Sequence, residues 1–461
     1  MKKCFLCLCL LTVIKISAQT DVTYTIESLE EGDEIYLGYH LADQKYVEDT
    51  LQVGPRGSVR MVYEDQLKPG LYFLYSPPKF YQEFIINEPR FTINTEGNGY
   101  ETFKASGSEE NDFFATFQLE IGKRQRERSQ LADSLKSLTG KDSIALVEEL
   151  KNLTNEYRKV QRELVASKPD LLVAKMVNLM IPVEPVSFPE IEDDAERRRK
   201  EYLKYRQDFR VRLDFKERGL LRTPVFKSSV LKYTSNVIPQ IPDSIIAEVD
   251  RIMDEVAVDS TSFRFWLVTF TSTYENHKTM GMDKVFIHIL EKYYLAGRAY
   301  WVDEETIKKM REEVYFVKPN LIGNLAPQLN LLDTTFTNVN VFNLPEDYLV
   351  LYFYDPGCGV CKKKTPILKN VYYDLKDSNA EVVAICGTTD VDKWKTYIIK
   401  NELDWLNLAD PYTTSNFRAE YNIRSFPQVF ILNKDRRIIA KRLGVEQVKG
   451  FINDHQTFFN K

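Results

Sequence analysis

The most informative stretch of the chain runs from Leu349 to Pro366 and reads LVLYFYDPGCGVCKKKTP. Its first six residues are apolar or aromatic, which is the pattern of a buried β-strand. Asp355-Pro356-Gly357 interrupts this run, because proline fixes φ and glycine accepts most turn geometries. Cys358 and Cys361 follow at the start of a segment with helical character. A strand, a tight turn and a helix that opens with C-x-x-C predict a redox-active pair of thiols.

The two cysteines are expected to differ in their chemistry. A thiol at a helix N-terminus faces unpaired backbone N–H groups and the positive end of the helix dipole, and both favour the thiolate. We therefore expect Cys358 to be the attacking nucleophile. Cys361, one turn further into the helix, is the expected resolving thiol, which closes the disulfide and expels the partner's sulfur.

Residues 319–461 resemble the thioredoxin superfamily, and within it the TlpA/ResA-like branch of exported thiol-disulfide oxidoreductases. The sequence GNLAP at 323–327 is similar to the family's segment ahead of its first strand. Pro366 corresponds to the proline that kinks the family's active-site helix. The sequence RSFPQVFIL at 424–432 carries Pro427 at the position of the superfamily's cis-proline.

The resemblance implies an α/β thioredoxin-like domain over residues 317–461. Cys358 and Cys361 would be the catalytic residues and form the redox-active disulfide, and Phe426 with Pro427 would bind the partner chain. We expect no cofactor, since the dithiol itself carries two electrons. The expected partners are proteins with disulfides or thiols, and an electron-donor protein that the sequence does not identify.

Three positions depart from the family pattern. The aromatic residue usual before the first cysteine is Gly357, and the carboxylate that many relatives carry three residues after the second is Lys364. The buried acid that thioredoxins place six residues before the first cysteine is Tyr352. The usual route for moving a proton off Cys361 is therefore missing. Asp355, which is close to the cysteines in sequence, is a candidate substitute.

A zinc site is the alternative interpretation of the cysteine pair. A tetrahedral zinc site needs four ligands, whereas residues 317–461 contain no second C-x-x-C and a single histidine, His455. We therefore expect no metal. Cys386, at the end of a predicted buried strand, is expected to behave as a small hydrophobic residue rather than as a third redox thiol.

The preferred function is a thiol-disulfide oxidoreductase of the protein-disulfide reductase type. The alternative is a non-catalytic binding or scaffold protein, in which a thioredoxin-like docking domain holds Cys358 and Cys361 as a static disulfide. A disulfide isomerase that dimerises through its helices is a third hypothesis. Replacing Cys361 with Ser separates the first two, because only an enzyme would accumulate mixed disulfides through Cys358.

Residues 1–18 have the pattern of a secretory signal peptide. Lys2 and Lys3 precede an apolar core at 4–14, and Ile16-Ser17-Ala18 is a plausible cleavage site. No cysteine follows a full apolar core behind a small residue, so we expect a periplasmic protein without a lipoprotein anchor. The sequence contains no stretch of eighteen apolar residues, so we expect no transmembrane helix.

The composition of the chain excludes two classes of protein. Charged residues make up 28% of the chain with both signs mixed, which argues against nucleic-acid binding. After signal removal only Cys358, Cys361 and Cys386 remain. An exported chain with so few cysteines is not held together by structural disulfides.

The sequence predicts a multidomain protein with an all-β, an all-α and an α/β part. Residues 19–106 alternate with period two between turn signals, which indicates six or seven strands in a small antiparallel sandwich or barrel. This part resembles an uncharacterised β-domain that often precedes thioredoxin-like domains in exported proteins. Residues 107–316 are expected to form a helical domain.

A helical hairpin is expected near the start of that helical domain. Apolar residues follow a heptad spacing: Leu146, Leu150, Leu153, Tyr157, Val160 and Leu164. A glycine-containing turn precedes them, which predicts an antiparallel hairpin packed within the chain. Dimerisation through the exposed seam is the alternative.

The sequence also predicts the later elements. Helices are expected at 243–256, 262–274, 282–294 and 303–314. In the C-terminal domain we expect strands at 349–354, 381–386, 428–432 and 438–442, and helices at 358–377, 391–401, 414–421 and 445–459.

Overall fold

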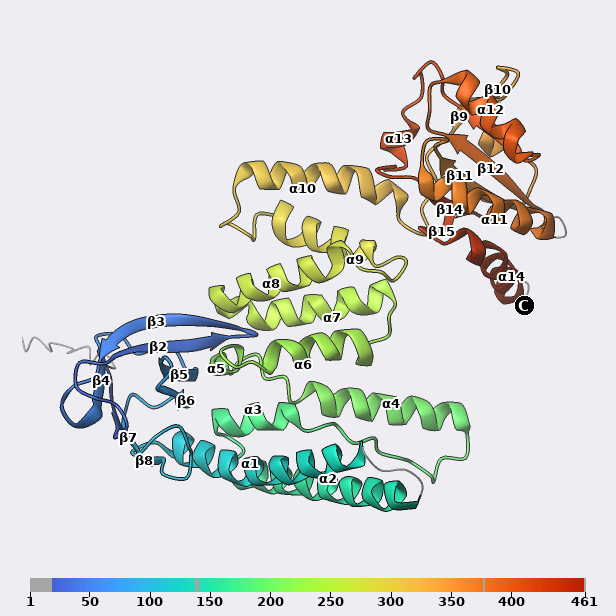
Figure 1. Cartoon of the computed structure of the whole chain (residues 1–461). Coiled ribbons are helices and arrows are strands. Elements are labelled where there is room, and N and C mark those ends of the chain that lie inside the picture. Colours follow the sequence, from blue (N-terminus) through green and yellow to red (C-terminus); the bar gives the residue numbers. More distant parts are fainter. Residues whose placement is uncertain (1–18, 137–140, 376–377, 460–461) are drawn as a thin grey trace, which may run out of the picture. The chain divides into compact units, whose positions relative to one another are not determined.

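The computed structural model describes residues 19–136, 141–375 and 378–459, and these form two compact units (Figure 1). One unit contains the chain up to residue 238 together with 255–258, and the other contains 239–254 and the chain from 259 onward. The predicted order of all-β, all-α and α/β parts is confirmed. The predicted signal peptide at 1–18 lies outside the described residues, and the boundaries at 106 and 316 stay predictions.

The N-terminal part is a β-sandwich of two four-stranded sheets, ordered β4-β1-β7-β8 and β3-β2-β5-β6. The strands are β1 (Thr20–Ile26), β2 (Glu34–Leu41), β3 (Gln44–Gln52), β4 (Ser58–Tyr63), β5 (Gly70–Ser76), β6 (Phe80–Ile86), β7 (Arg90–Thr95) and β8 (Lys104–Ser106). The alternating residues Val22, Tyr24 and Ile26 of β1 are fully buried between the sheets, as their period predicts.

Two expectations for this part were wrong. The sandwich is not purely antiparallel, because β1 and β7 pair in parallel while β1 and β4 pair antiparallel. Between β1 and β7 the chain forms the whole second sheet and also the antiparallel strand β4, and β7 then runs in the direction of β1. The described strands number eight rather than the expected six or seven. Edge strand β3 is exposed and rich in charged residues, so its sequence lacks the alternation of a half-buried strand.

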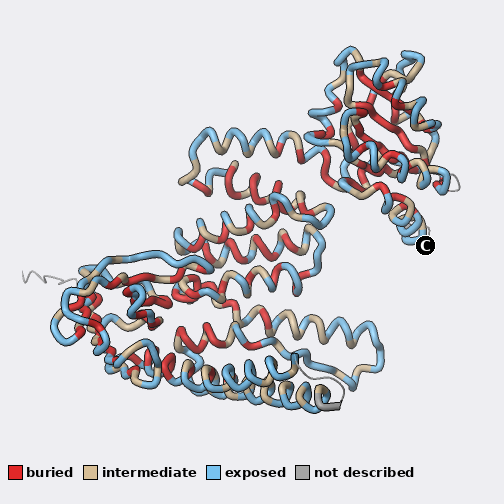
Figure 2. Tube along the Cα trace, viewed as in Figure 1, coloured by how far each residue is buried: buried red, intermediate tan, exposed pale blue. Residues whose placement is uncertain are grey.

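Six helices follow the sandwich in the first unit. They are α1 (Glu109–Leu135), α2 (Lys141–Ser167), α3 (Leu172–Met180), α4 (Asp194–Arg210), α5 (Arg218–Leu221) and α6 (Phe226–Lys232), the last continued by a π-helix at Tyr233–Val237. Helices α1 and α2 pack against each other, as the predicted hairpin requires. The turn expected between them falls on residues 137–140, which lie outside the described ranges. The heptad residues of the hairpin are half-buried, in keeping with packing inside the chain. Figure 2 shows the hairpin as largely exposed or intermediate.

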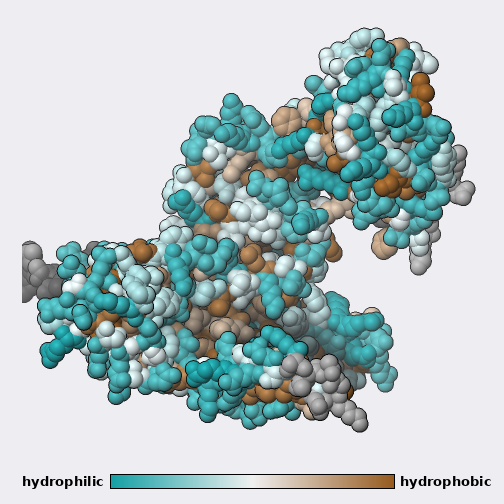
Figure 3. All heavy atoms as spheres, viewed as in Figure 1, coloured by the Kyte–Doolittle hydropathy of each residue, from teal (hydrophilic) through white to brown (hydrophobic). Residues whose placement is uncertain are grey.

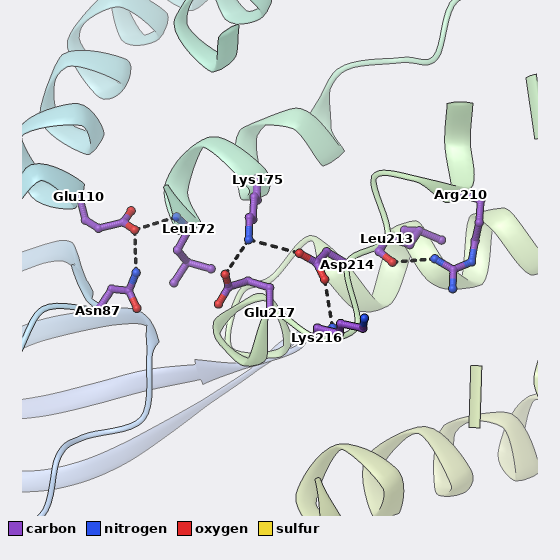
Figure 4. A network of polar contacts seen from close by, with 9 residues as sticks. All are labelled: Asn87, Glu110, Leu172, Lys175, Arg210, Leu213, Asp214, Lys216 and Glu217. Atoms are coloured by element: carbon purple, nitrogen blue, oxygen red, sulfur yellow. Dashed lines mark hydrogen bonds and ion pairs between the residues drawn. The ribbon is translucent and has the colours of Figure 1, made fainter. Parts of the chain in front are cut away.

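A buried carboxylate joins α1 to α3 (Figure 4). Glu110 accepts hydrogen bonds from the backbone N–H groups of Leu172 (2.7 Å) and Val173 (3.0 Å) and from the side chain of Asn87 (2.8 Å). The Leu172 and Val173 N–H groups are the first two of α3, so Glu110 caps this helix from outside. Burial raises the pKa of Glu110, and these hydrogen bonds oppose that rise. Next to it, Lys175 pairs with Asp214 and Glu217.

Hydrophobic residues on the molecular face of Figure 3 are scattered among hydrophilic ones. None of the helices within the described ranges is long and apolar enough to cross a membrane.

The second unit begins with four helices, which match the predicted positions. They are α7 (Pro242–Glu255), α8 (Ser260–Glu275), α9 (Asp283–Ile289), continued by a π-helix at Leu290–Leu295, and α10 (Glu304–Val317). Within this unit the buried Lys441 pairs with Asp283 and donates a hydrogen bond to the Asn320 carbonyl (2.5 Å). Burial lowers the pKa of Lys441.

The C-terminal part is a seven-stranded sheet with helices on both faces, ordered β10-β9-β13-β12-β11-β14-β15. Its strands are β9 (Asn330–Leu332), β10 (Asn338–Asn340), β11 (Tyr348–Tyr354), β12 (Ala380–Cys386), β13 (Leu406–Ala409), β14 (Gln428–Leu432) and β15 (Ile438–Lys441). Its helices are α11 (Gly359–Leu375), α12 (Val391–Asn401), α13 (Phe417–Glu420) and α14 (Val448–Phe459). The central strand β11 is parallel to β12 and antiparallel to β14.

Every residue of β11 is buried, because both faces of the sheet are covered. Val350, Tyr352 and Tyr354 pack with residues of α11, α12 and α14, whereas Leu351 and Phe353 face the core that includes α13. The end of β11 is therefore held from both sides where the chain turns into α11.

Two C-terminal expectations need correction. Strands β9, β10 and β13 were not predicted, because their three or four residues are too short to display a period. The helix expected at 414–421 is only the single turn α13. The Asp410 carboxylate accepts hydrogen bonds from the backbone N–H groups of Thr414 (2.9 Å) and Ser415 (2.8 Å), which folds this stretch as a turn. Residues 376–377, the end of the helix expected from 358, lie outside the described ranges.

The cap of α3 gives a stability prediction. In Glu110→Gln one acceptor oxygen becomes an amide donor that cannot pair with the N–H groups facing it. We expect the free energy of unfolding of this unit to fall by about 1–3 kcal/mol in urea titrations. Glu109→Gln is the matched control, because Glu109 pairs with Lys168 on the surface and its loss costs only about 0–1 kcal/mol. Equal effects of the two changes would contradict the capping role.

Candidate functional site

The candidate site lies where β11 ends and α11 begins. The Cys358 N–H donates to the Asp355 carbonyl (3.0 Å), which closes the predicted turn. The Cys358 sulfur in turn accepts a hydrogen bond from the Cys361 N–H (3.2 Å). Cys358 thus takes the place of an N-cap residue at the first residues of α11, and its sulfur meets a backbone donor that favours negative charge. Its side chain is partly exposed.

Cys361 lies in the opposite environment, because it is fully buried in the core under the sheet. Burial raises the pKa of the Cys361 thiol, and the charges of Cys358 and Asp355 add to the rise. Cys361 is therefore a protonated thiol at neutral pH. The two cysteines that the sequence singled out lie together, one accessible and one buried.

The third predicted element is the loop that contains Phe426 and Pro427, here called the proline loop, and it contacts the first cysteine. The peptide bond between Phe426 and Pro427 is cis, as predicted. The Cys358 thiol donates a hydrogen bond to the Phe426 carbonyl (3.4 Å). The backbone oxygen that the resemblance assigns to the partner chain is thus directed at the reactive sulfur.

The Phe426 ring lies within the chain's own packing. It contacts Gly387, where a side chain would collide with the ring at 2.3 Å. The Arg418 guanidinium lies 5.1 Å from the ring centre. Phe426 is half-buried, and an apolar contact between this ring and a partner stays a prediction.

The positions that lack the family's carboxylates have other contacts. Lys364 reaches away from the cysteines and pairs with Glu446 (3.0 Å). The Asp355 carboxylate accepts a hydrogen bond from the Gly357 N–H (2.6 Å), so it stabilises the turn. Tyr352 is fully buried and its hydroxyl is 3.0 Å from that of Thr365.

Sequence reasoning missed Thr365 and Tyr397, which join Tyr352 in one hydrogen-bonded cluster. Thr365 could have been found, because it lies four residues after Cys361 and so on the same helix face. Tyr397 belongs to α12, and no sequence spacing points to its neighbours.

Cys386 lies in the buried position that the sequence predicts. Cys386 is buried, and burial raises the pKa of its thiol to about 12. Among the described residues, no three or more His, Cys, Asp or Glu side chains are grouped so as to hold a metal ion.

Beside the proline loop, a cavity of about 600 Å³ is lined by Arg424, Ser425 and Gln428 together with residues of α10.

Part of the chain is similar to known proteins. Residues 346–438 match a protein family described as thioredoxin-like. The thiol-disulfide oxidoreductase ResA of Bacillus cereus is 22% identical over 134 residues, which cover 28% of this chain and 76% of the relative. The protein of the same name from Bacillus anthracis is 22% identical over 138 residues, with the same coverage.

Two solved structures are also similar. A thioredoxin-like protein from Bacteroides caccae ATCC 43185 is 18% identical with a TM-score of 0.46, and the match covers 59% of this chain and 98% of that one. A domain of a possible thiol-disulfide isomerase from Cytophaga hutchinsonii ATCC 33406 is 29% identical with a TM-score of 0.29, over 30% of this chain and 96% of that one.

The unlike environments of the cysteines predict a selective alkylation pattern. At neutral pH iodoacetamide should modify Cys358 and leave Cys361 and Cys386 unmodified, since both are buried and protonated. Peptide mass mapping after a short reaction measures this, and the urea-unfolded protein, in which all three should react, is the control. Modification of Cys361 as fast as Cys358 in the folded protein would contradict the site geometry.

Proposed function

Because the C-terminal domain of this chain belongs to the thioredoxin superfamily, we propose that the protein is a thiol-disulfide oxidoreductase that acts on partner proteins through Cys358 and Cys361. One observation carries the proposal: an accessible sulfur at a helix N-terminus accepts the N–H of a buried second cysteine (3.2 Å). This arrangement separates the roles of the thiols, since one can attack a partner and the other is shielded until a mixed disulfide has formed.

The proposed reaction runs in the reducing direction and in two steps. First, the Cys358 thiolate attacks a partner's disulfide, one partner sulfur bonds to Cys358, and the other leaves with the electron pair. The Cys361 sulfur then attacks Cys358, and the second partner sulfur leaves as a thiolate. The partner gains two electrons and the pair becomes a disulfide. An electron-donor protein, still unidentified, returns the pair to the dithiol.

The loop of Phe426 and Pro427 is proposed to hold the partner. In the free protein the Phe426 carbonyl accepts the Cys358 thiol hydrogen. A mixed disulfide has no such hydrogen, so this carbonyl becomes available to an N–H of the partner's extended backbone. This hydrogen bond between two backbones is independent of the partner's side chains, so it suits an enzyme that accepts several partner proteins.

The site of action is proposed to be the periplasm. The support is the N-terminal pattern of basic residues, apolar core and small residues at 1–18. We propose that the protein is exported through this segment and meets its partners there.

A trapping experiment tests the function. In Cys361→Ser the first step proceeds and the second cannot, so cells expressing this variant should accumulate mixed disulfides through Cys358. Non-reducing gels and mass spectrometry of the purified variant detect them. Cys386→Ser, which removes a buried cysteine outside the pair, is the matched control and should trap no partners. Cys358→Ser/Cys361→Ser should also trap none.

Absence of partners on Cys361→Ser, together with unreactive Cys358 in the folded protein, would overturn the proposal. The scaffold interpretation would then stand.

A further inference from the structure

The Phe426 ring is held beside the reactive cysteine by residues of two other elements. At Gly387, which follows β12, a Cβ atom would lie 2.3 Å from the ring, so a larger residue would push the ring away. The Gly387 N–H donates to the carbonyl of Tyr354, the last residue of β11 (2.7 Å). The Arg418 guanidinium of α13 lies over the ring, 5.1 Å from its centre, and donates a hydrogen bond to the Gly387 carbonyl. Arg418 is therefore fixed in place on the ring of Phe426.

The Arg418 guanidinium is held at one end and open at the other. Arg418 is exposed, and a guanidinium carries five N–H donors. Within the described ranges it donates to the Gly387 carbonyl, and no acidic side chain pairs with it. Two other arginines of the domain are already committed, since Arg424 pairs with Glu313 and Arg436 donates to three backbone carbonyls. Arg418 is thus an oriented cation with donors left for a ligand.

This cation lies next to the point where a partner chain would be held. The Phe426 carbonyl accepts the Cys358 thiol hydrogen (3.4 Å), and the proposed function gives this carbonyl to the partner's backbone. Side chains of directly opposite residues in two paired extended chains lie about 5 Å apart. A partner residue opposite Phe426 would therefore place its side chain beside the guanidinium that covers the ring.

The neighbouring charges leave Arg418 as the favourable contact for an anion. Glu420 follows two residues later on α13, and residues two apart on a helical turn do not face each other. The Lys393 ammonium lies 3.3 Å from the position that a Cβ of Gly357 would take, but the Asp355 carboxylate lies 3.0 Å from the same position. The charge of Lys393 is therefore offset by a nearby acid, whereas that of Arg418 is not.

We propose that Arg418 is a specificity-determining residue that binds a carboxylate of the partner chain beside its reactive cysteine, so that partners with Asp or Glu at this position are preferred. The proposal rests on the proposed function, because it concerns the partner held by the proline loop. A guanidinium binds a carboxylate through charge-assisted hydrogen bonds, and it repels a Lys or Arg side chain at the same place.

Model partners test this preference. Three peptides of equal length are prepared, each with one cysteine that carries thionitrobenzoate in a disulfide, and with Glu, Gln or Lys next to that cysteine. The Cys358 thiolate of the reduced full-length protein bonds to the peptide sulfur, the peptide's disulfide breaks, and yellow thionitrobenzoate leaves with the electron pair. The Cys361 sulfur then attacks Cys358, and the peptide leaves as a thiolate.

We expect the Glu peptide to release thionitrobenzoate about fivefold faster than the Gln peptide at low salt, as for a favourable exposed ion pair. The Lys peptide should be the slowest of the three. In about 0.5 M NaCl the three rates should converge, because salt screens charges at exposed positions. Stopped-flow absorbance at several peptide concentrations gives the second-order rate constants.

Variants of the cation show whether Arg418 is the cause. Arg418→Gln should abolish the preference, and Arg418→Lys, which keeps the charge without the planar fork, should retain about twofold. Loss of the guanidinium also frees the Phe426 ring, which affects all three peptides equally, so the readout is the ratio of rates. Lys400→Gln is the matched control, because it removes an exposed cation from the last turn of α12. It should keep the fivefold ratio.

The outcomes separate the two proposals. If the wild-type protein does not distinguish the peptides, or if Arg418→Gln slows all of them and keeps their ratio, Arg418 merely holds the Phe426 ring and the specificity proposal is overturned. The proposed function stands in both cases. If none of the peptides releases thionitrobenzoate from the wild-type protein, the proposed function itself fails.

Discussion

The hydrogen bond from the Cys361 N–H to the Cys358 sulfur is the contact on which the proposed chemistry depends (3.2 Å). It exists only because β11 stops where the chain must turn. Pro356 and Gly357 prevent a further strand residue, and the Asp355 carbonyl and carboxylate close the turn. Helix α11 then begins with Cys358 in the place of its cap. Residues packed on both faces of the sheet bury the central strand β11 and so hold the start of this turn in place.

The same geometry explains why the two thiols are not interchangeable. Cys358 is partly exposed and its sulfur meets a backbone donor, whereas Cys361 is buried and burial raises the pKa of its thiol. This difference suits Cys358 to meet a partner's disulfide first and Cys361 to act second.

Local patterns in the sequence were enough to predict the site's main parts. The apolar run of β11, the turn at Asp355-Pro356-Gly357 and the C-x-x-C pair are continuous in sequence. Pro427, by contrast, was identified by the resemblance of residues 424–432 to the thioredoxin superfamily. The parts that were missed depend on distant contacts. Tyr397 meets Thr365 from 32 residues away, and the parallel pairing of β1 with β7 arises only after the second sheet is built. Edge strand β3 has the composition of a loop.

The domains ahead of the thioredoxin-like part add surfaces rather than recognisable chemistry. The sandwich is tied to the helices by contacts such as the hydrogen bond from Asn87, which follows β6, to Glu110 of α1 (2.8 Å). In the second unit, a cavity bordered by Arg424 and Ser425 adjoins the proline loop that would hold a partner.

The redox equilibrium of Cys358 and Cys361 against glutathione or dithiothreitol tests the central claim most directly, read by mass after thiol alkylation. The account predicts a two-electron couple confined to these two cysteines, with a potential near or below about −250 mV, on the reducing side of the thioredoxin-like scale. A pair that does not exchange at all while the protein is folded would contradict it. A value near about −120 mV would keep the enzyme but reverse the proposed direction of electron flow.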